Sequence, residues 1–158
     1  MRFPMLLLGL TLATAPSPAV ARAAWPPWLS IEAPVNPFDP STKDAVMLVH
    51  VRLREGTASA SRLAGTAEGI VRGRRRSVQL RFDTTALPGV FALRRQWPAE
   101  GTWLVRVTFA HTTAIVTLDG IGNVASVRVP TRQAQGHPIP RPVGPAEIDS
   151  VLALAARP

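Results

Sequence analysis

The densest group of side chains that could do chemistry is a run of arginines. Arg72, Arg74, Arg75 and Arg76 surround Gly73, between two segments with alternating apolar residues. Guanidinium groups bind carboxylates and phosphates through paired hydrogen bonds. A glycine before a charged tip between two strands is typical of a β-hairpin. The run therefore predicts an anion-binding hairpin.

Further arginines extend this candidate site. We expect Arg81 on the outward face of the next strand, and Arg94, Arg95 and Arg106 on a second hairpin. If the two hairpins are neighbours, they form one arginine-rich face; if they lie apart, each is an ordinary solvated surface. The candidate binding residues are Arg72, Arg74, Arg75, Arg76, Arg81, Arg94, Arg95 and Arg106.

The overall charge also points to an anionic partner. Eighteen basic residues face ten acidic ones, and Lys43 is the only lysine. A basic chain suits phospholipid head groups, lipopolysaccharide or an acidic protein. The alternative is a composition that uses arginine wherever a surface cation is needed. Nucleic acid is not an expected partner, because the chain is predicted to be secreted.

Other chemistry has less support. His50 and Met47 point to opposite faces of one predicted strand, and His111 and His137 lie far away in the sequence, so we expect no metal site. No Gly-x-Ser-x-Gly motif, paired acids or phosphate loop is present, so we expect no catalytic residue and no cofactor. An enzyme whose site the sequence does not reveal stays an alternative.

The first 23 residues are typical of a secretory signal peptide. Arg2 precedes an apolar run at 5–15, and small residues follow in 19-AVARA-23. The run is shorter than the roughly 20 residues needed to cross a bilayer, so no transmembrane segment is expected after cleavage. We therefore predict a periplasmic or secreted protein. The chain contains no cysteine, which excludes a disulfide framework.

Residues 24–44 predict an extended, proline-rich arm with at most one short edge strand, Trp28 to Glu32. Trp25 and Trp28 either cover an edge of the core or form an exposed aromatic patch. Period-2 alternation then runs through residues 45–130, which we expect to form one β domain.

The stretch 87-LPGVFALRRQWPAEGTWLVRV-107 predicts two strands within this domain. Phe91 and Leu93 alternate with smaller or charged residues before the turn at 98–101, and Trp103 begins a second alternating run. We expect these strands to pair as a hairpin, with Trp103 as a packing anchor.

The spacing of strands and turns predicts an all-β fold. Seven strands, or eight with the arm, are typical of an immunoglobulin-like two-sheet β-sandwich, and a small antiparallel barrel is the alternative. Residues 131–144 predict a proline-rich extended linker. Residues 145–156 predict a short helix that docks on its own domain or is captured by a partner, with an apolar stripe of Ile148, Val151, Leu152 and Ala155.

The segments Pro88-Gly89-Val90-Phe91 and Pro98-Ala99-Glu100-Gly101 leading to Trp103 resemble small bacterial periplasmic immunoglobulin-like domains of the YtkA-like and FixH-like group. The resemblance implies an accessory or carrier role in the cell envelope, linked in some members to copper or oxidase assembly. Few methionines and histidines are present here to bind copper. We expect a non-enzymatic binding or accessory domain acting through protein or anionic-surface contacts, with a cell-envelope copper carrier or assembly factor as the alternative.

Overall fold

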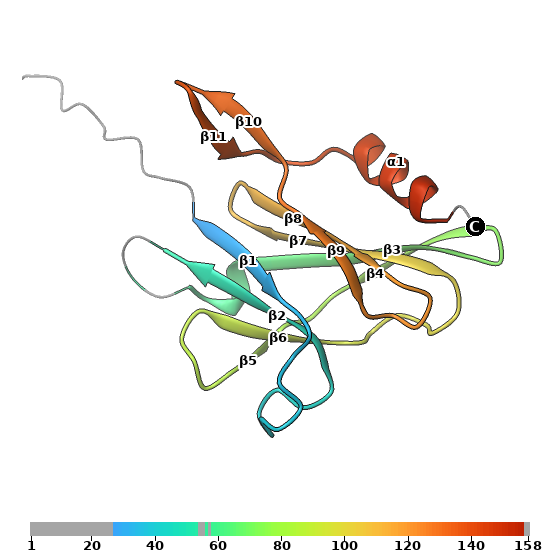
Figure 1. The fold of residues 1–158 in the computed structure, drawn as a ribbon, viewed down its shortest axis with the longest axis horizontal. Helices are drawn as coiled ribbons and strands as arrows, with labels where there is room; N and C mark the ends of the chain where they lie inside the picture. The colour runs from blue at the N-terminus through green and yellow to red at the C-terminus, as the bar shows by residue number, and fades with distance from the viewer. Residues whose placement is uncertain (1–26, 54–55, 57, 157–158) are drawn as a thin grey trace, which may run out of the picture.

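The structure is a computed structural model that describes residues 27–53, 56 and 58–156. The predicted signal peptide and Trp25 lie outside these residues. The described chain is mostly antiparallel β-structure, followed by one short C-terminal helix (Figure 1). The all-β prediction is confirmed at this level.

Most strands belong to two sheets. The four-stranded sheet has the order β1-β2-β6-β5, and its strands are β1 (Trp28–Glu32), β2 (Ala45–Arg52), β5 (Asp83–Thr84) and β6 (Val90–Arg94). The five-stranded sheet has the order β4-β3-β7-β8-β9, and its strands are β3 (Leu63–Val71), β4 (Arg74–Gln79), β7 (Thr102–Phe109), β8 (Thr112–Leu118) and β9 (Val124–Arg128). A 3-10 turn, η1 (Ala60–Arg62), precedes β3.

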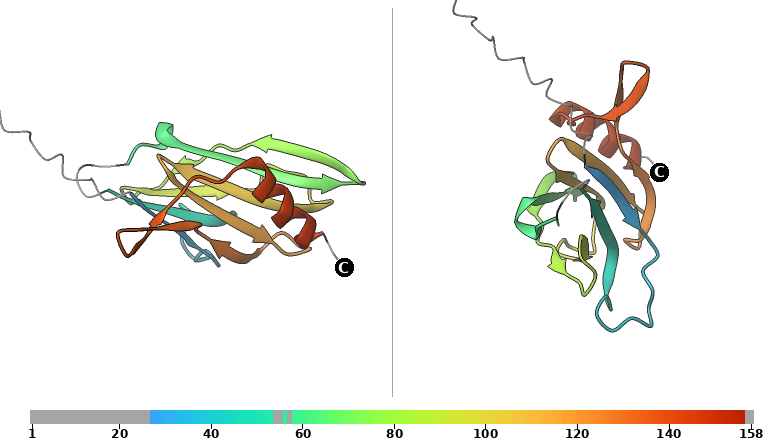
Figure 2. Two further views of the ribbon diagram at one scale, coloured as in Figure 1. Left: turned by 90° about the horizontal axis from the view of Figure 1, so that it is seen from above. Right: turned by 90° about the vertical axis from the view of Figure 1, so that its left-hand side faces the viewer.

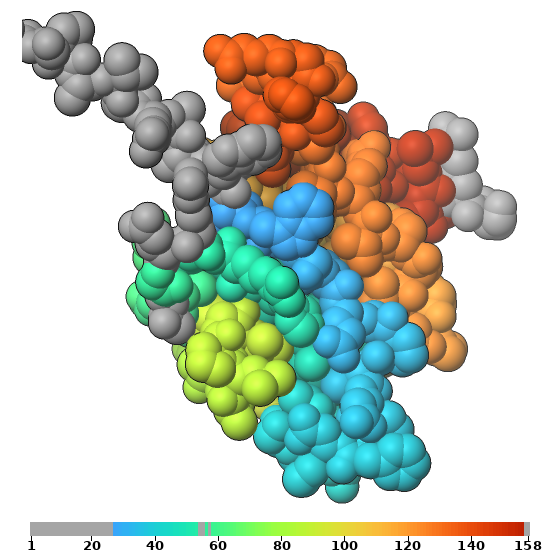
Figure 3. All heavy atoms as spheres, turned by 60° about the vertical axis from the view of Figure 1, so that its left-hand side comes forward, coloured from blue at the N-terminus to red at the C-terminus, as the bar shows by residue number. Residues whose placement is uncertain are grey.

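The proline-rich segments on both sides of these sheets form short strands. The expected edge strand Trp28–Glu32 is present as β1. Trp28 does not cover the core, because its side chain is 67% exposed and the neighbouring Leu29 points inward instead. The segment expected to be an extended linker contains a hairpin of β10 (Thr131–Ala134) and β11 (His137–Pro140), which projects from the body of the protein (Figure 3).

One cluster of buried side chains draws on both sheets. The four-stranded sheet supplies Met47, Val49, Phe91 and Leu93, and the five-stranded sheet supplies side chains from β3, β7 and β8. These are the apolar positions that alternate along each predicted strand, because successive side chains of a strand point to opposite faces. The alternation predicted for residues 45–130 is confirmed in β2, β6, β7 and β8, because one alternating set of side chains from each strand is buried in this cluster.

The predicted pairing around the turn at 98–101 is wrong. β6 pairs with β2 and β5 in the four-stranded sheet, whereas β7 pairs with β3 and β8 in the other. Residues 95–101 carry the chain from one sheet to the other, with Trp97 buried on the way. This connection is longer than the two to five residues that usually close a hairpin.

Trp103 is confirmed as a packing anchor, with only 4% of its surface exposed. Its indole ring lies over Gly69 of the adjacent strand β3, where an added Cβ would approach the ring carbons to 2.4 Å. The indole N–H donates to the carbonyl oxygen of Glu100 at 2.9 Å. Glycine at position 69 is therefore required by the indole ring.

The C-terminal helix, α1 (Pro145–Ala155), packs against the outer face of the five-stranded sheet (Figure 2). Ile148 and Leu152 form a second buried cluster with Leu104 of β7 and Ile115 of β8. The helix therefore docks on its own domain through the predicted stripe. No helix in the part of the chain that the structure describes is long and apolar enough to cross a membrane.

Glu147 in the first turn of α1 adds polar contacts. Its carboxylate accepts from Arg128 at 3.3 Å and pairs with Arg141 at 2.8 Å. Arg128 belongs to β9 and Arg141 follows β11, so this one carboxylate holds the start of the helix against two preceding segments. Such exposed pairs orient the helix but contribute little free energy.

Replacement of Gly69 by Ala tests the packing of Trp103. The added methyl group collides with a ring that the core prevents from moving, so we expect the free energy of unfolding to fall by about 1–3 kcal/mol. Urea denaturation measures this change. Gly120→Ala is the matched control, because no atom lies within 4 Å of the added Cβ there. Equal effects of the two substitutions would contradict the packing described here.

Replacement of Leu152 by Ala tests the docking of α1. The substitution leaves a cavity against Leu104 and Ile115, and we expect a loss of about 2–5 kcal/mol in the free energy of unfolding. Leu154→Ala, at a side chain that is 61% exposed, should change it by less than about 0.5 kcal/mol. Thermal unfolding of both variants is the measurement. If the helix docked elsewhere, the two substitutions would lower the stability by similar amounts.

Candidate anion-binding site

The predicted hairpin at the arginine run exists, but its turn lies earlier than expected. Arg72 and Gly73 form the turn, with φ angles of 50° and 74°, and β4 begins at Arg74. Positive φ at both central residues is the geometry of the tight turn that matches the twist of paired strands. Arg74, Arg75 and Arg76 are therefore strand residues and do not form a loop tip.

Strand geometry divides these three arginines between two faces. Arg74 lies opposite Val71 and Arg76 lies opposite Gly69, whereas Arg75 lies between them opposite Ile70. Because successive side chains alternate, Arg74 and Arg76 share a face that Arg75 does not.

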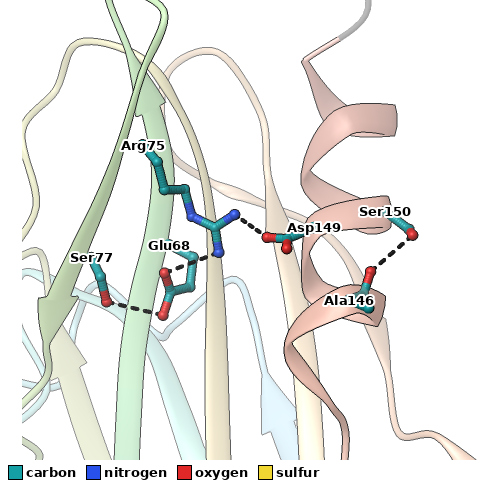
Figure 4. Close-up of polar contacts among 6 residues, drawn as sticks. All are labelled: Glu68, Arg75, Ser77, Ala146, Asp149 and Ser150. Atoms are coloured by element: carbon teal, nitrogen blue, oxygen red, sulfur yellow. Dashed lines mark hydrogen bonds and ion pairs between the residues drawn. The ribbon is translucent and has the colours of Figure 1, made fainter.

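Arg75 is occupied on the outer face of the sheet. Its guanidinium lies between the carboxylates of Glu68 on β3 and Asp149 on α1, and its Nη2 donates to Glu68 Oε2 at 3.3 Å (Figure 4). Ser77 Oγ donates to the other oxygen of Glu68 at 3.0 Å. The hydrogen bond to Asp149 is the main cause that raises the pKa of Arg75. Arg75 thus ties β4 to the helix.

The opposite face of β4 borders a hollow of about 760 Å³. Its charged lining residues are Arg72, Arg74, Arg76 and Glu100, and its apolar lining includes Val78, Pro98 and Trp103. The hollow therefore combines cationic with apolar side chains, and ligand sites typically pair an apolar lining with a few placed polar groups.

The charges around this hollow do not cancel. Arg72 donates to both carboxylate oxygens of Glu100, from Nε at 2.9 Å and from Nη2 at 3.2 Å. Arg74 and Arg76 have no ion-pair partner among the described residues. Two neighbouring guanidinium groups therefore remain available to an anion.

The other four candidates lie elsewhere. Arg94 pairs with Asp83, and Arg95 Nη2 donates to the carbonyl oxygen of Ile121 at 2.7 Å. Arg106 projects from β7 onto the face that α1 partly covers, and Arg81 is exposed beyond the end of β4. The structure brings Arg72, Arg74 and Arg76 together. It does not place the arginines of the expected second hairpin beside them, because β6 belongs to the other sheet and Arg106 of β7 points to the face opposite that of Arg74 and Arg76.

Sequence reasoning missed the rest of the lining. Trp103 was assigned only to packing and Glu100 only to a turn, and Val78 was given no role in binding. The relevant signal was the alternation of Arg74, Arg76 and Val78 at every second residue, which places them on one face of a strand.

One histidine, His50, contacts an acidic side chain within the four-stranded sheet. His50 Nε2 lies 2.7 Å from Glu32 Oε2, across the β1–β2 pair. The described residues contain no group of three or more His, Cys, Asp or Glu side chains arranged to hold a metal ion.

Searches of protein-family models, curated proteins and solved structures found no match to this chain.

Two single variants, Arg75→Ala and Arg74→Ala, test whether the arginines on the two faces of β4 have different roles. Loss of Arg75 leaves the largely buried carboxylate of Glu68 with only Ser77, and we expect the free energy of unfolding to fall by about 1 kcal/mol, since the pair is partly screened by solvent. Arg74→Ala should change it by less than about 0.5 kcal/mol. Urea denaturation measures both, and the opposite order would mean that the faces of β4 are reversed.

Proposed function

We propose that the two sheets form an immunoglobulin-like sandwich. In such folds one sheet has the strands A, B, E and D, and the other has C, F and G. Taking β1, β2 and β3 as A, B and C, with β5 to β8 as D to G, gives the same two groups, and β4 lies beside β3 as C′ does in variable domains. The strand order and the shared core support this assignment.

On this scaffold, the protein acts as a non-enzymatic binding or accessory domain that holds an anionic partner at β4. The observation that carries the proposal is the pair Arg74 and Arg76, which lie on one face beside the hollow without an acidic partner among the described residues. The predicted signal peptide supports a periplasmic or secreted location. The resemblance to YtkA-like and FixH-like domains supports an accessory role in the cell envelope.

The competing explanation is that the arginines only protect an exposed sheet edge. Charged side chains on edge strands do prevent pairing between molecules. A protective edge needs charge but no hollow, whereas β4 places two cations that have no ion-pair partner among the described residues beside a hollow lined by Pro98 and Trp103. This arrangement favours binding.

Binding of fluorescently labelled poly-L-glutamate tests this function. We expect salt-dependent binding, and the double variant Arg74→Ala/Arg76→Ala should weaken it about fivefold, as for two exposed ion pairs of about 0.5 kcal/mol each. Fluorescence anisotropy at several salt concentrations is the measurement.

The matched control for this test is Arg52→Ala/Arg132→Ala, which removes the same charge from exposed positions on β2 and β10. It should change the affinity less than about twofold, through the net charge alone. If both double variants weaken binding equally, β4 is not the site.

A further inference from the structure

Among the described strands, β4 is the outermost of its sheet and pairs with β3 alone. In an antiparallel pair, alternate residues direct their backbone N–H and C=O groups toward the partner strand. The two-residue turn makes Arg74 bond to Val71, and Leu80 N–H donates to Gly65 O at 2.9 Å, so the even-numbered residues face β3. Arg75, Ser77 and Gln79 consequently direct their backbone groups outward.

The side chain of Gln96 already bonds to this edge as a neighbouring strand would. The Gln96 amide accepts from the Arg81 backbone N–H at 2.9 Å and donates to the Arg81 carbonyl oxygen at 2.7 Å. These are the two bonds that a neighbouring strand makes with one outward-facing residue. Arg81 continues the odd-numbered series, which independently supports the outward direction of Arg75, Ser77 and Gln79.

The two faces of β4 impose different requirements on a strand placed beside it. Next to the hollow, its side chains would meet Arg74 and Arg76, which favour acids, and then Val78, which favours an apolar residue. On the other face, Glu68 and Asp149 already neutralise Arg75, so additional acids there would be repelled.

We infer that β4 binds an extended acidic peptide segment as an additional antiparallel strand. Read from its N-terminus, the segment has the pattern apolar-x-acid-x-acid, where x is uncharged. The apolar residue lies opposite Val78, and the acids lie opposite Arg76 and Arg74. This inference rests on the proposed function and specifies its partner. Strand addition combines backbone hydrogen bonds with side-chain selection at every second residue.

The antiparallel direction follows from the position of the arginines. Arg74 and Arg76 bond to β3 through their backbones, so residues opposite them on the new strand form pairs without mutual backbone bonds. Side chains approach most closely in such pairs, which favours ion pairs. The x residues, opposite Ser77 and Arg75, then supply the backbone bonds.

Charge complementarity favours this occupant over two others. A second copy of β4 would bring one run of three arginines against another across the new pair, which is unfavourable. A bilayer surface that approaches the hollow would meet the carboxylate of Glu100 as well as the arginines.

The test peptide is Thr-Val-Thr-Glu-Thr-Glu-Thr with blocked ends, and binding is measured by isothermal titration calorimetry with the whole mature protein. The reversed peptide, Thr-Glu-Thr-Glu-Thr-Val-Thr, has the same composition and should bind about fivefold more weakly. The third and fifth residues of the test peptide are the threonines that precede its two glutamates. N-methylation of these two threonines removes the backbone N–H groups that would donate to β4, and it should weaken binding about tenfold. N-methylation of the two glutamates should leave the affinity within about twofold, because their N–H groups point away from β4.

Hydrogen exchange of backbone amides gives a second measurement, which binding through charge alone would not change. Bound peptide should slow exchange at the Ser77 and Gln79 amides and leave the β9 amides unaffected. Arg74→Ala/Arg76→Ala should weaken peptide binding about fivefold, while Arg52→Ala/Arg132→Ala should change it less than about twofold.

The results separate this inference from the function on which it rests. If poly-L-glutamate binding depends on Arg74 and Arg76 but the peptide shows no preference for direction or for free threonine amides, strand addition is wrong and the anion site stands. If neither ligand depends on these arginines, both proposals are wrong. Binding of phosphatidylglycerol vesicles at β4 without binding of the peptide would identify a membrane as the occupant and overturn the inference.

Discussion

The contact between Trp103 and Gly69 is the constraint on which much of the structure depends. The indole needs the space that a side chain at position 69 would occupy, and a large ring can enter this region only because that space is empty. Once placed, the ring contributes to the common core and to the lining of the hollow. Its N–H also holds Glu100, which is the residue that neutralises Arg72. One aromatic packing contact thus connects the core with the charge balance at the surface.

A second close approach to β3 fixes the path between the two sheets. Gly101 has a φ of 99° and lies so close to the Ile70 carbonyl oxygen that a Cβ would approach it to 2.6 Å. Gly101 and Trp103 therefore bring the chain tightly onto β3 at the point where it arrives from the other sheet. The buried side chain of Trp97 occupies the middle of this crossing.

Alternation in the sequence predicted the directions of side chains better than the partners of strands. Phe91 and Leu93 were placed together on one face by their alternation, Trp103 was expected to be a packing anchor, and all three are buried. The error concerned β6 and β7, because alternation describes a single strand and contains no information about its neighbour. The hairpin of β10 and β11 was missed for a related reason, since prolines weaken a strand pattern but can be accommodated at an edge. The helix was predicted well because its apolar stripe and Pro145 are local signals.

The candidate site was predictable only as a concentration of arginine. Whether a guanidinium is available depends on acids that are remote in the chain: Asp149 reaches Arg75 from the helix, and Glu100 reaches Arg72 from the crossing segment. Alternation separates the face of Arg75 from the face of Arg74 and Arg76, but it does not show which of the two faces carries the acids. The acids make this distinction in three dimensions, and they reduce the eight candidates to Arg74 and Arg76 on β4, with Arg72 in the adjoining turn.

The hydrogen bonds of the Gln96 amide to Arg81 have a further consequence for this edge. They close one end of the exposed ladder, while the turn at Arg72 and Gly73 closes the other. Only a few outward-facing backbone positions lie between these limits. Along an uninterrupted edge, a neighbouring chain could pair in several registers that differ by two residues. A bounded edge allows a single register, so the length of β4 itself helps to select the segment that binds.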